Sequence, residues 1–227
     1  MLCKWKELPA FMQTEEVRSY YDILAKRRLS LVIKRTFDFM MSSIMLIVLA
    51  PVLLVLGVWI KMDSKGPVFY RQERVTQYGR KFRIYKFRTM VQDADKIGSL
   101  VTVGGDSRIT KVGQKLRGCR LDELPQLINI WKGEMSFVGT RPEVMKYVKG
   151  YTKEMYATLL LPAGVTSEAS IEYKDEAELL DKAEDIDKTY IEQILPGKMF
   201  WNLKSIREFS FLYEIILMFK TILAVLK

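Results

Sequence analysis

Two adjacent carboxylates, Asp122 and Glu123, stand in the stretch RLDELPQLINIWKG, just before a proline and near Arg117 and Arg120. Adjacent carboxylates repel each other, so one can act as a nucleophile or metal ligand while the other accepts a proton. Nearby arginines would hold an anionic substrate against that repulsion. The alternative is structural, because acids at a helix start cap its free N–H groups and favour its dipole. This stretch alone leaves both interpretations open.

The composition narrows the chemistry that is available. The chain holds no histidine, which excludes Ser-His-Asp and Cys-His mechanisms and imidazole metal sites. Its two cysteines, Cys3 and Cys119, are too few for a disulfide framework or a four-ligand zinc site. Acid–base or nucleophilic catalysis would therefore depend on carboxylates, Lys, Tyr or Cys. Any metal would be a hard cation held by oxygen, with Mg2+ the first candidate.

The basic residues predict an anionic partner. The 227 residues include 36 Lys and Arg against 27 Asp and Glu, a net charge of +9. Between Arg71 and Arg88, basic residues alternate with aromatic ones, which predicts short strands and fits a lipid patch or a nucleic-acid face. Lys86 also lies there, in the motif YKFRTM. Farther on, Arg141 before Pro142 is either a phosphate clamp or a surface ion pair.

An apolar segment, Phe39–Ile60, contains twenty-two residues without a charge, enough to cross a bilayer. Pro51 lies near its centre and removes one helical hydrogen bond. Lys and Arg crowd both flanks, and a crossing helix cannot place both flanks on the cytoplasmic side. The residues alone leave two forms open: a kinked single span, and a helix broken at Pro51 that enters and leaves the same leaflet.

Other helices are predicted from their capping residues and from the distribution of charge. Thr14 opens a helix that ends in basic residues, and LPQLINIWK is a short helix stopped by Gly133. Residues 168–192 are acidic and indicate a solvated helical face without a site. The apolar C-terminal segment carries Glu214 and Lys220, which favour a helix in the membrane interface or packed on the domain.

Taken together, the motifs resemble one family. The chain is similar to the catalytic unit of the monotopic bacterial phosphoglycosyl transferases, the bacterial sugar transferase family, from about Lys34 to Thr166. The residues that carry the resemblance are KRTFDFMMSSIMLIVLAPVLL, GPVFYRQERV, KFRIYKFRTM, DSRITKVGQKLR, LDELPQLINIWKGEMSFVGTRPE and LPAGVT. The order and spacing of YKFRTM, LDELPQL and GTRP are specific, whereas any one of them alone would be weak.

The resemblance implies a reaction and its residues. It implies transfer of a sugar-1-phosphate from a UDP-sugar to undecaprenyl phosphate, with release of UMP and dependence on Mg2+. Asp122 would attack the β-phosphate, form a covalent phosphosugar intermediate and touch the metal, while Glu123 would assist with the acceptor. The substrate-binding residues that it implies are Lys86, Arg88, Arg141 and Pro142.

Three departures from the family pattern leave details open. Ala50 precedes Pro51 where the family has Ser-Pro, which leaves the hairpin angle open. The motif GTRP replaces the commoner Gly-Pro-Arg-Pro of the family and retains the arginine, Arg141. After LPAGVT, the usual Gly-Trp run is replaced by SEASIEYKDEAELL, in a region tied to sugar recognition. The transferred sugar therefore stays open.

We therefore expect a mixed α/β, mostly helical, membrane-associated catalytic fold. Its parts would be an N-terminal helical extension (1–33), a re-entrant helix-break-helix hairpin (34–62) and a catalytic domain with a C-terminal interfacial amphipathic helix (63–227). The expected location is the cytoplasmic face of the inner (plasma) membrane, with both termini cytoplasmic. The expected partners are a UDP-sugar, undecaprenyl phosphate and membrane lipid, without nucleic acid, and a homodimer is left open. The rivals are a membrane-tethered basic binding module and a membrane-associated nucleic-acid binder, both without catalysis.

Overall fold

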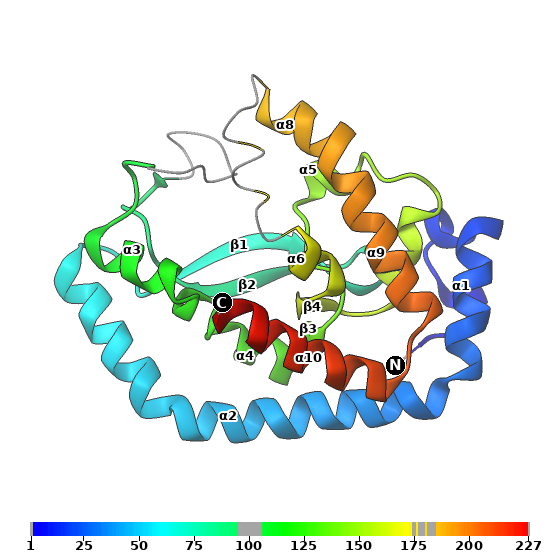
Figure 1. Ribbon diagram of the computed structural model, residues 1–227, viewed down its shortest axis with the longest axis horizontal. Coiled ribbons are helices and arrows are strands. Elements are labelled where there is room, and N and C mark those ends of the chain that lie inside the picture. The colour runs from blue at the N-terminus through cyan, green and yellow to red at the C-terminus, as the bar shows by residue number, and fades with distance from the viewer. Residues whose placement is uncertain (1, 95–105, 174–175, 177–179, 181–184, 227) are drawn as a thin grey trace.

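The computed structural model describes residues 2–94, 106–173, 176, 180 and 185–226. Its architecture is mixed α/β and mostly helical, as the sequence predicted (Figure 1). The longest element, α2 (Arg28–Asp63), lies beneath the rest of the domain. The other helices are α1 (Glu15–Lys26), α3 (Lys111–Gly118), α4 (Gln126–Lys132), α5 (Met145–Val148), α6 (Glu168–Glu172), α8 (Ile186–Thr189), α9 (Leu195–Arg207) and α10 (Phe211–Leu226).

Two pairs of strands lie above α2. β1 (Phe69–Val75) and β2 (Lys81–Phe87) form an antiparallel hairpin, and β3 (Met135–Val138) pairs in parallel with β4 (Ala163–Thr166). The hairpin confirms the strands predicted from the alternating basic stretch. In its register Tyr70 lies opposite Lys86. Because side chains alternate between the two faces of a strand, Tyr70, Gln72 and Arg74 of β1 share one face of the hairpin with Lys86 of β2.

α2 is one continuous helix through Pro51, and Figure 1 shows it bend along its course. A proline removes one hydrogen bond and clashes with the preceding turn, which kinks a helix without ending it. The predicted hairpin of two separate helices is therefore replaced by a single bent helix. Its bounds also differ from the predicted 34–62, since the helix already begins at Arg28.

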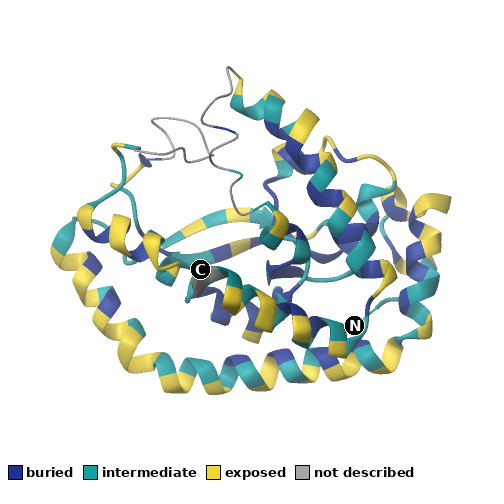
Figure 2. Ribbon diagram, in the orientation of Figure 1, coloured by how far each residue is buried: buried dark blue, intermediate teal, exposed yellow. Residues whose placement is uncertain are grey.

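α2 buries three polar side chains against the domain and exposes many of its apolar ones. Lys34, Asp38 and Ser42 follow one another at four-residue intervals, which places them on one face, and all three are buried against the domain. The opposite face is apolar and exposed (Figure 2), with Ile47 at 76% and Leu54 at 69% exposure. An exposed apolar surface of this extent is typical of a membrane interaction site. In length and composition α2 is compatible with membrane association.

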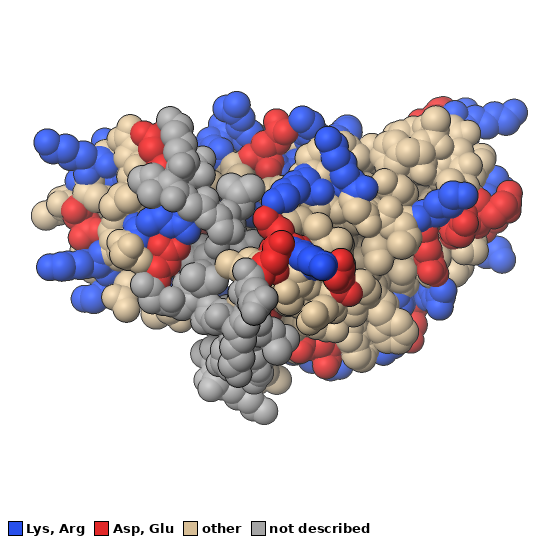
Figure 3. Space-filling model, turned by 90° about the horizontal axis from the view of Figure 1, so that it is seen from above, with Lys and Arg blue, Asp and Glu red and all other residues tan. Residues whose placement is uncertain are grey.

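Charged side chains lie on the face of the molecule away from α2. Figure 3 looks onto the molecule from the side away from α2, and lysines, arginines and acids are spread over the face it shows. The molecule therefore presents an apolar face along α2 and a charged one opposite it. This polarity agrees with a protein that rests on a bilayer through α2.

The N-terminal segment is part of the core. Thr14 caps α1, as predicted, because its side chain accepts a hydrogen bond from the Val17 N–H group. Val17, Tyr20 and Leu24 on this helix are buried, and they pack in one cluster with residues of α9 such as Met199. Residues 1–33 thus contribute α1 to the core and their last residues to α2.

The C-terminal helix is tied to α2 by a buried ion pair. Lys34 donates a hydrogen bond to the Val138 carbonyl oxygen at 2.9 Å and another to the Glu214 carboxylate. Both charged side chains are almost fully buried. α10 contacts α2, β3 and α6, which confirms its predicted packing on the domain. Its far side exposes apolar residues such as Leu212 and Phe219.

The acidic stretch 168–192 is described in part, and residues 174–175, 177–179 and 181–184 lie outside the described residues. The prediction that this stretch forms a solvated face is wrong for two of its acids. Glu168 accepts a hydrogen bond from the Tyr213 hydroxyl at 2.5 Å, and Glu176 accepts one from buried Lys198 at 2.9 Å. These contacts attach the stretch to α9 and to the start of α10.

Candidate active site

Asp122 and Glu123 lie in a short 3-10 turn, Leu121–Glu123, between α3 and α4. Arg120, which precedes the turn, has a left-handed backbone with φ of 53°, a conformation that costs a non-glycine residue roughly 1–2 kcal/mol. The first residue of α4 receives no side-chain cap. The acidic pair therefore does not cap α4, so the structural interpretation of Asp122 and Glu123 is not supported.

Glu123 is held by two cations. Its Oε1 atom accepts hydrogen bonds from Lys86 Nζ at 2.8 Å and from Arg141 Nη2 at 2.6 Å. Burial opposes ionisation of this carboxyl, but the charges and hydrogen bonds of Arg141 and Lys86 outweigh it and lower the pKa of Glu123. Glu123 is thus a fixed carboxylate whose charge is already neutralised by its neighbours.

Asp122 has the opposite environment. No ion pair to another described side chain holds its carboxylate. Burial raises the pKa of Asp122, Lys86 opposes the rise, and the charge of Glu123 adds to it. Two neighbouring carboxyl groups whose pKa values are moved apart are typical of a pair with separate chemical roles. Asp122 is the one whose oxygens are available to a substrate or a metal ion.

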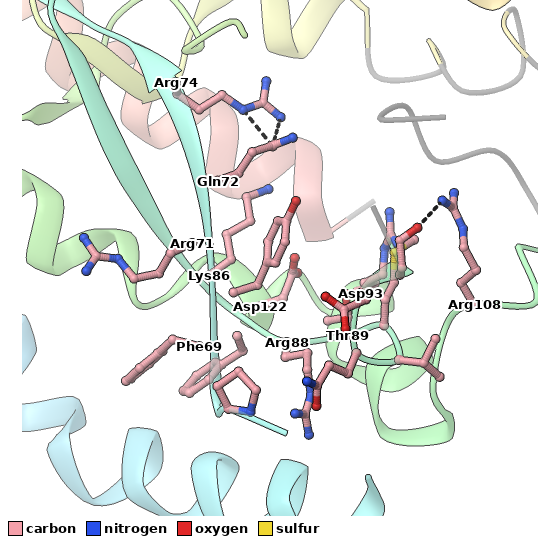
Figure 4. A pocket seen from close by; sticks show the side chains of 18 residues that line it. Phe69, Arg71, Gln72, Arg74, Lys86, Arg88, Thr89, Asp93, Arg108 and Asp122 are labelled. Atoms are coloured by element: carbon pink, nitrogen blue, oxygen red, sulfur yellow. Dashed lines mark hydrogen bonds between the residues drawn. The ribbon is translucent and has the colours of Figure 1, made fainter. Parts of the chain in front are cut away.

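A basic cavity of about 400 Å³ opens beside Asp122 (Figure 4). Its floor is the part of the β1–β2 hairpin that carries Tyr70, Gln72 and Lys86, and its other walls come from the segment after β2 and from α3. The cationic side chains that line it are Arg71, Arg74, Lys86, Arg88, Arg108 and Arg117. A concave site with so many cations fits a polyanion such as a diphosphate.

Arg88 has donor groups that an anion in this cavity could use. The residue is 5% exposed, and its Nη2 atom donates to the Ser64 backbone oxygen at 2.7 Å. Its Nε and Nη1 atoms are buried and have no partner among the described residues. Burial lowers the pKa of Arg88, with Asp63 opposing the shift. Because unpaired buried donors are costly, a bound anion that accepted from them would be stabilised.

Arg141 lies on another side of the acidic pair. It lines a second cavity, of about 270 Å³, together with Glu123. The charge of Glu123 raises the pKa of Arg141. Pro142 is buried and lines neither of these cavities, and its carbonyl oxygen accepts a hydrogen bond from Arg74 Nη1 at 3.2 Å. The structure thus places Lys86 and Arg141 against Glu123, and Arg88 in the cavity that Asp122 borders, while substrate contact by Pro142 stays a prediction.

The residues fit a magnesium ion that a substrate helps to hold. Among the described residues no group of three acids, histidines or cysteines comes together. Asp122 nevertheless offers a carboxylate at the edge of a cavity suited to a diphosphate, and no side chain in the described part of the chain forms an ion pair with it. Mg2+ commonly binds one or two carboxylates plus substrate phosphates and keeps several waters. Asp122 is therefore the residue that would hold it.

Comparison with known proteins settles the family. The model of the family described as bacterial sugar transferase matches residues 29–227. The chain belongs to the bacterial sugar transferase family. A UDP-N-acetylgalactosamine-undecaprenyl-phosphate N-acetylgalactosaminephosphotransferase of Aeromonas hydrophila is 36% identical over 198 residues, which cover 86% of this chain and 44% of that protein. A UDP-glucose:undecaprenyl-phosphate glucose-1-phosphate transferase of Escherichia coli (strain K12) is 33% identical over 195 residues, 84% of this chain and 39% of that protein.

A third relative in the sugar transferase family has the same printed name as the Escherichia coli protein. The UDP-glucose:undecaprenyl-phosphate glucose-1-phosphate transferase of Klebsiella pneumoniae is 37% identical over 162 residues, 69% of this chain and 34% of that protein. The chain thus spans less than half of the length of these three relatives. Their names agree on undecaprenyl phosphate and differ in the sugar.

Two features of this sugar transferase site were not predicted. One is the link between Glu123 and Lys86, because strand periodicity predicts a face for Lys86 but not its partner in another element. The other is Gln126, which is 1% exposed and lines the second cavity. A glutamine at the start of a predicted helix carries no sequence signal that separates it from an ordinary surface residue.

Proposed function

We propose that this chain transfers a sugar-1-phosphate from a UDP-sugar to undecaprenyl phosphate and releases UMP. The observation that carries the proposal is the unequal acidic pair: Asp122 borders the basic cavity without an ion pair to any described side chain, whereas Glu123 is held by Lys86 and Arg141. The printed names of the family relatives supply the substrate class. Such a transfer would start the assembly of a capsule, exopolysaccharide or glycoconjugate.

The reaction begins at the carboxylate of Asp122. One of its oxygens attacks the β-phosphorus of the UDP-sugar, the bond from that phosphorus to the bridging oxygen breaks, and UMP leaves with the bridging oxygen. The product is an aspartyl phosphosugar. An oxygen of undecaprenyl phosphate then attacks the same phosphorus, which frees Asp122 and forms the lipid diphosphosugar. Splitting one transfer into two displacements is the usual use of a covalent nucleophile.

The other residues stabilise charge and position. Phosphoryl transfer depends mostly on alignment and on neutralising charge on the phosphate oxygens, which Arg88 and Lys86 supply from the cavity floor. Glu123 fixes Lys86 and Arg141 in place through its hydrogen bonds. Mg2+, when bound at Asp122 and the diphosphate, would neutralise further charge and orient the leaving group.

We expect α2 to enter and leave one leaflet of the inner (plasma) membrane, with the domain and both termini on the cytoplasmic side. Both ends of α2 pack on the same domain: Lys34 binds Glu214, and Ile60 packs with Leu116 and Phe87. A straight helix of 36 residues would be roughly 54 Å long, far more than the hydrocarbon core needs. A bend at Pro51 supports a shallow entry in which the apolar convex side faces lipid.

Cysteine accessibility tests this topology. In a background with Cys3 and Cys119 replaced by serine, Lys26→Cys and Lys65→Cys place one thiol on each flank of the apolar segment. Both thiols should resist an impermeant maleimide in intact cells and react once the cells are permeabilised, because both flanks lie inside. Labelling of one flank from outside would show that α2 spans the membrane.

Arg141→Ala should lower kcat/KM for UMP release roughly tenfold to a hundredfold, the cost of one charge-assisted hydrogen bond. The loss has two sources, since Arg141 would no longer bind a phosphate and Glu123 would keep only Lys86. Arg141→Lys should recover part of the activity, because the charge returns without the forked geometry. Arg207→Ala is the matched control, since Arg207 pairs with Glu154 on the surface and lines neither cavity. If kcat/KM were unchanged in Arg141→Ala, Arg141 would only form an ion pair with Glu123 and would not bind the substrate.

The proposed reaction itself is tested with purified protein, Mg2+, undecaprenyl phosphate and a panel of UDP-sugars. UMP should form with at least one sugar, together with a lipid-linked phosphosugar in equal amount. A binding module or a nucleic-acid binder would release no UMP with any of them, and that result would reject the proposal. The panel also identifies the sugar, which the relatives' names leave open.

A further inference from the structure

The two carboxylates of the acidic pair border different cavities. Asp122 lines the basic one, and Glu123 lines the second, of about 270 Å³. We propose that the second cavity receives the phosphate end of the isoprenoid acceptor, and that Gln126 positions the acceptor phosphate there. The inference rests on the proposed function and adds to it the place where the acceptor binds and a residue that binds it.

Gln126 is the observation that points to a ligand. Its side chain is 1% exposed, and its amide nitrogen has no hydrogen-bond partner among the described residues. Leaving a buried amide donor unsatisfied is costly, so native proteins usually pair such groups with protein, water or a ligand. The same cavity is lined by Arg120 and Arg141. An amide donor beside two cations is complementary to a phosphate monoester.

The rest of the cavity is complementary to a hydrocarbon. Most of the other residues that line it are apolar: Met45, Leu124, Leu127, Ile130, Phe137, Val165, Ile171 and Ala224. Apart from Leu124, which precedes α4, they come from α2, α4, β3, β4, α6 and α10, so the cavity lies between the two helices that expose apolar faces. A lipid whose phosphate lay at Gln126 could therefore pass its chain toward the bilayer along α2 and α10.

This arrangement gives each substrate its own approach to the reacting phosphorus. The diphosphate of the donor would bind among the cations beside Asp122, and the acceptor phosphate would arrive beside Glu123. A free membrane phospholipid shares the hydrocarbon chemistry of the acceptor but carries a substituted phosphate. The acceptor monophosphate offers more free oxygens to Gln126, Arg120 and Arg141, and this difference is what the cavity would select.

Kinetics provide the first test. Gln126→Leu should raise the KM for undecaprenyl phosphate roughly tenfold to a hundredfold, with the KM for the UDP-sugar changed less than about twofold. The stoichiometric burst of UMP without acceptor should persist, because the donor half-reaction uses the other cavity. Gln114→Leu on α3, which is exposed and lines neither cavity, is the matched control. An unchanged acceptor KM, or an equal rise in both KM values, would overturn the assignment.

Photolabelling tests the site without turnover, so its outcome is separate from that of the proposed transfer. A diazirine-bearing isoprenyl monophosphate should label peptides of α4, α6 or α10, and undecaprenyl phosphate should compete. Ala224→Phe should reduce labelling by filling the apolar wall, whereas Ile222→Phe, on the exposed side of α10, should not. Labelling confined to the basic cavity, or equal competition by undecaprenol or phospholipid, would overturn the proposal.

Discussion

Asp122→Asn is expected to abolish turnover, with a loss on the order of 10³ or more, the size found when a covalent nucleophile is removed. The amide has nearly the same shape but no nucleophilic oxygen, so the first displacement cannot occur. The change should not disturb the fold, because no described side chain forms an ion pair with Asp122. Its effect should therefore appear in the chemistry and not in thermal unfolding.

Intact mass after incubation with a UDP-sugar, without acceptor, measures the same step directly. The wild-type enzyme should gain the mass of one phosphosugar, and Asp122→Asn should gain none. Glu123→Gln should still form the adduct, more slowly, since Glu123 positions cations and does not attack. Asp22→Asn on the surface of α1 is the control for the substitution itself. Wild-type-like turnover in Asp122→Asn would contradict the assignment.

Removal of divalent cations is expected to lower UMP release by roughly a hundredfold or more, and added Mg2+ should restore it. The donor diphosphate must approach a carboxylate of like charge, and two unit charges 4 Å apart cost about 4 kcal/mol at an effective dielectric constant of 20. Mg2+ between them would turn that repulsion into attraction.

Removal of divalent cations should not change the thermal stability of the protein. No described cluster of acids could hold a structural ion, so the unfolding temperature without substrate should not change on chelation. With a UDP-sugar present, Mg2+ should raise that temperature, because the ion binds with the diphosphate. Full UMP release after exhaustive chelation would show that the cations of the cavity suffice alone.

Local patterns predicted the elements that frame the site. Alternation in the stretch that ends in YKFRTM predicted the strands that form β1 and β2, and Gly133, with a left-handed φ of 80°, ends α4 as expected. These signals work because they depend on neighbours a few residues away. The acidic pair, with Arg141 and YKFRTM, could likewise be singled out before the fold was known.

Long-range contacts could not be read in the same way. Local patterns do not distinguish Asp122 from Glu123, and only the family resemblance gave them different roles. The fold pairs Glu123 with Lys86, 37 positions away, whereas no described side chain forms an ion pair with Asp122. The signal at Pro51 predicted a break, but packing of both ends of α2 against the domain keeps one bent helix. Which polar group stays buried without a partner, as at Gln126, depends on the whole structure.

The ion pair between Lys34 and Glu214 has a consequence for how the protein is made. The two residues are 180 positions apart, so at about 5–20 residues per second roughly 10–40 s separate their emergence from the ribosome. In that interval the apolar face of α2 can already meet the membrane, while Lys34 has no carboxylate from α10. The buried ion pair therefore forms only after α10 has been synthesised, so the last helix completes the packing of the first long one.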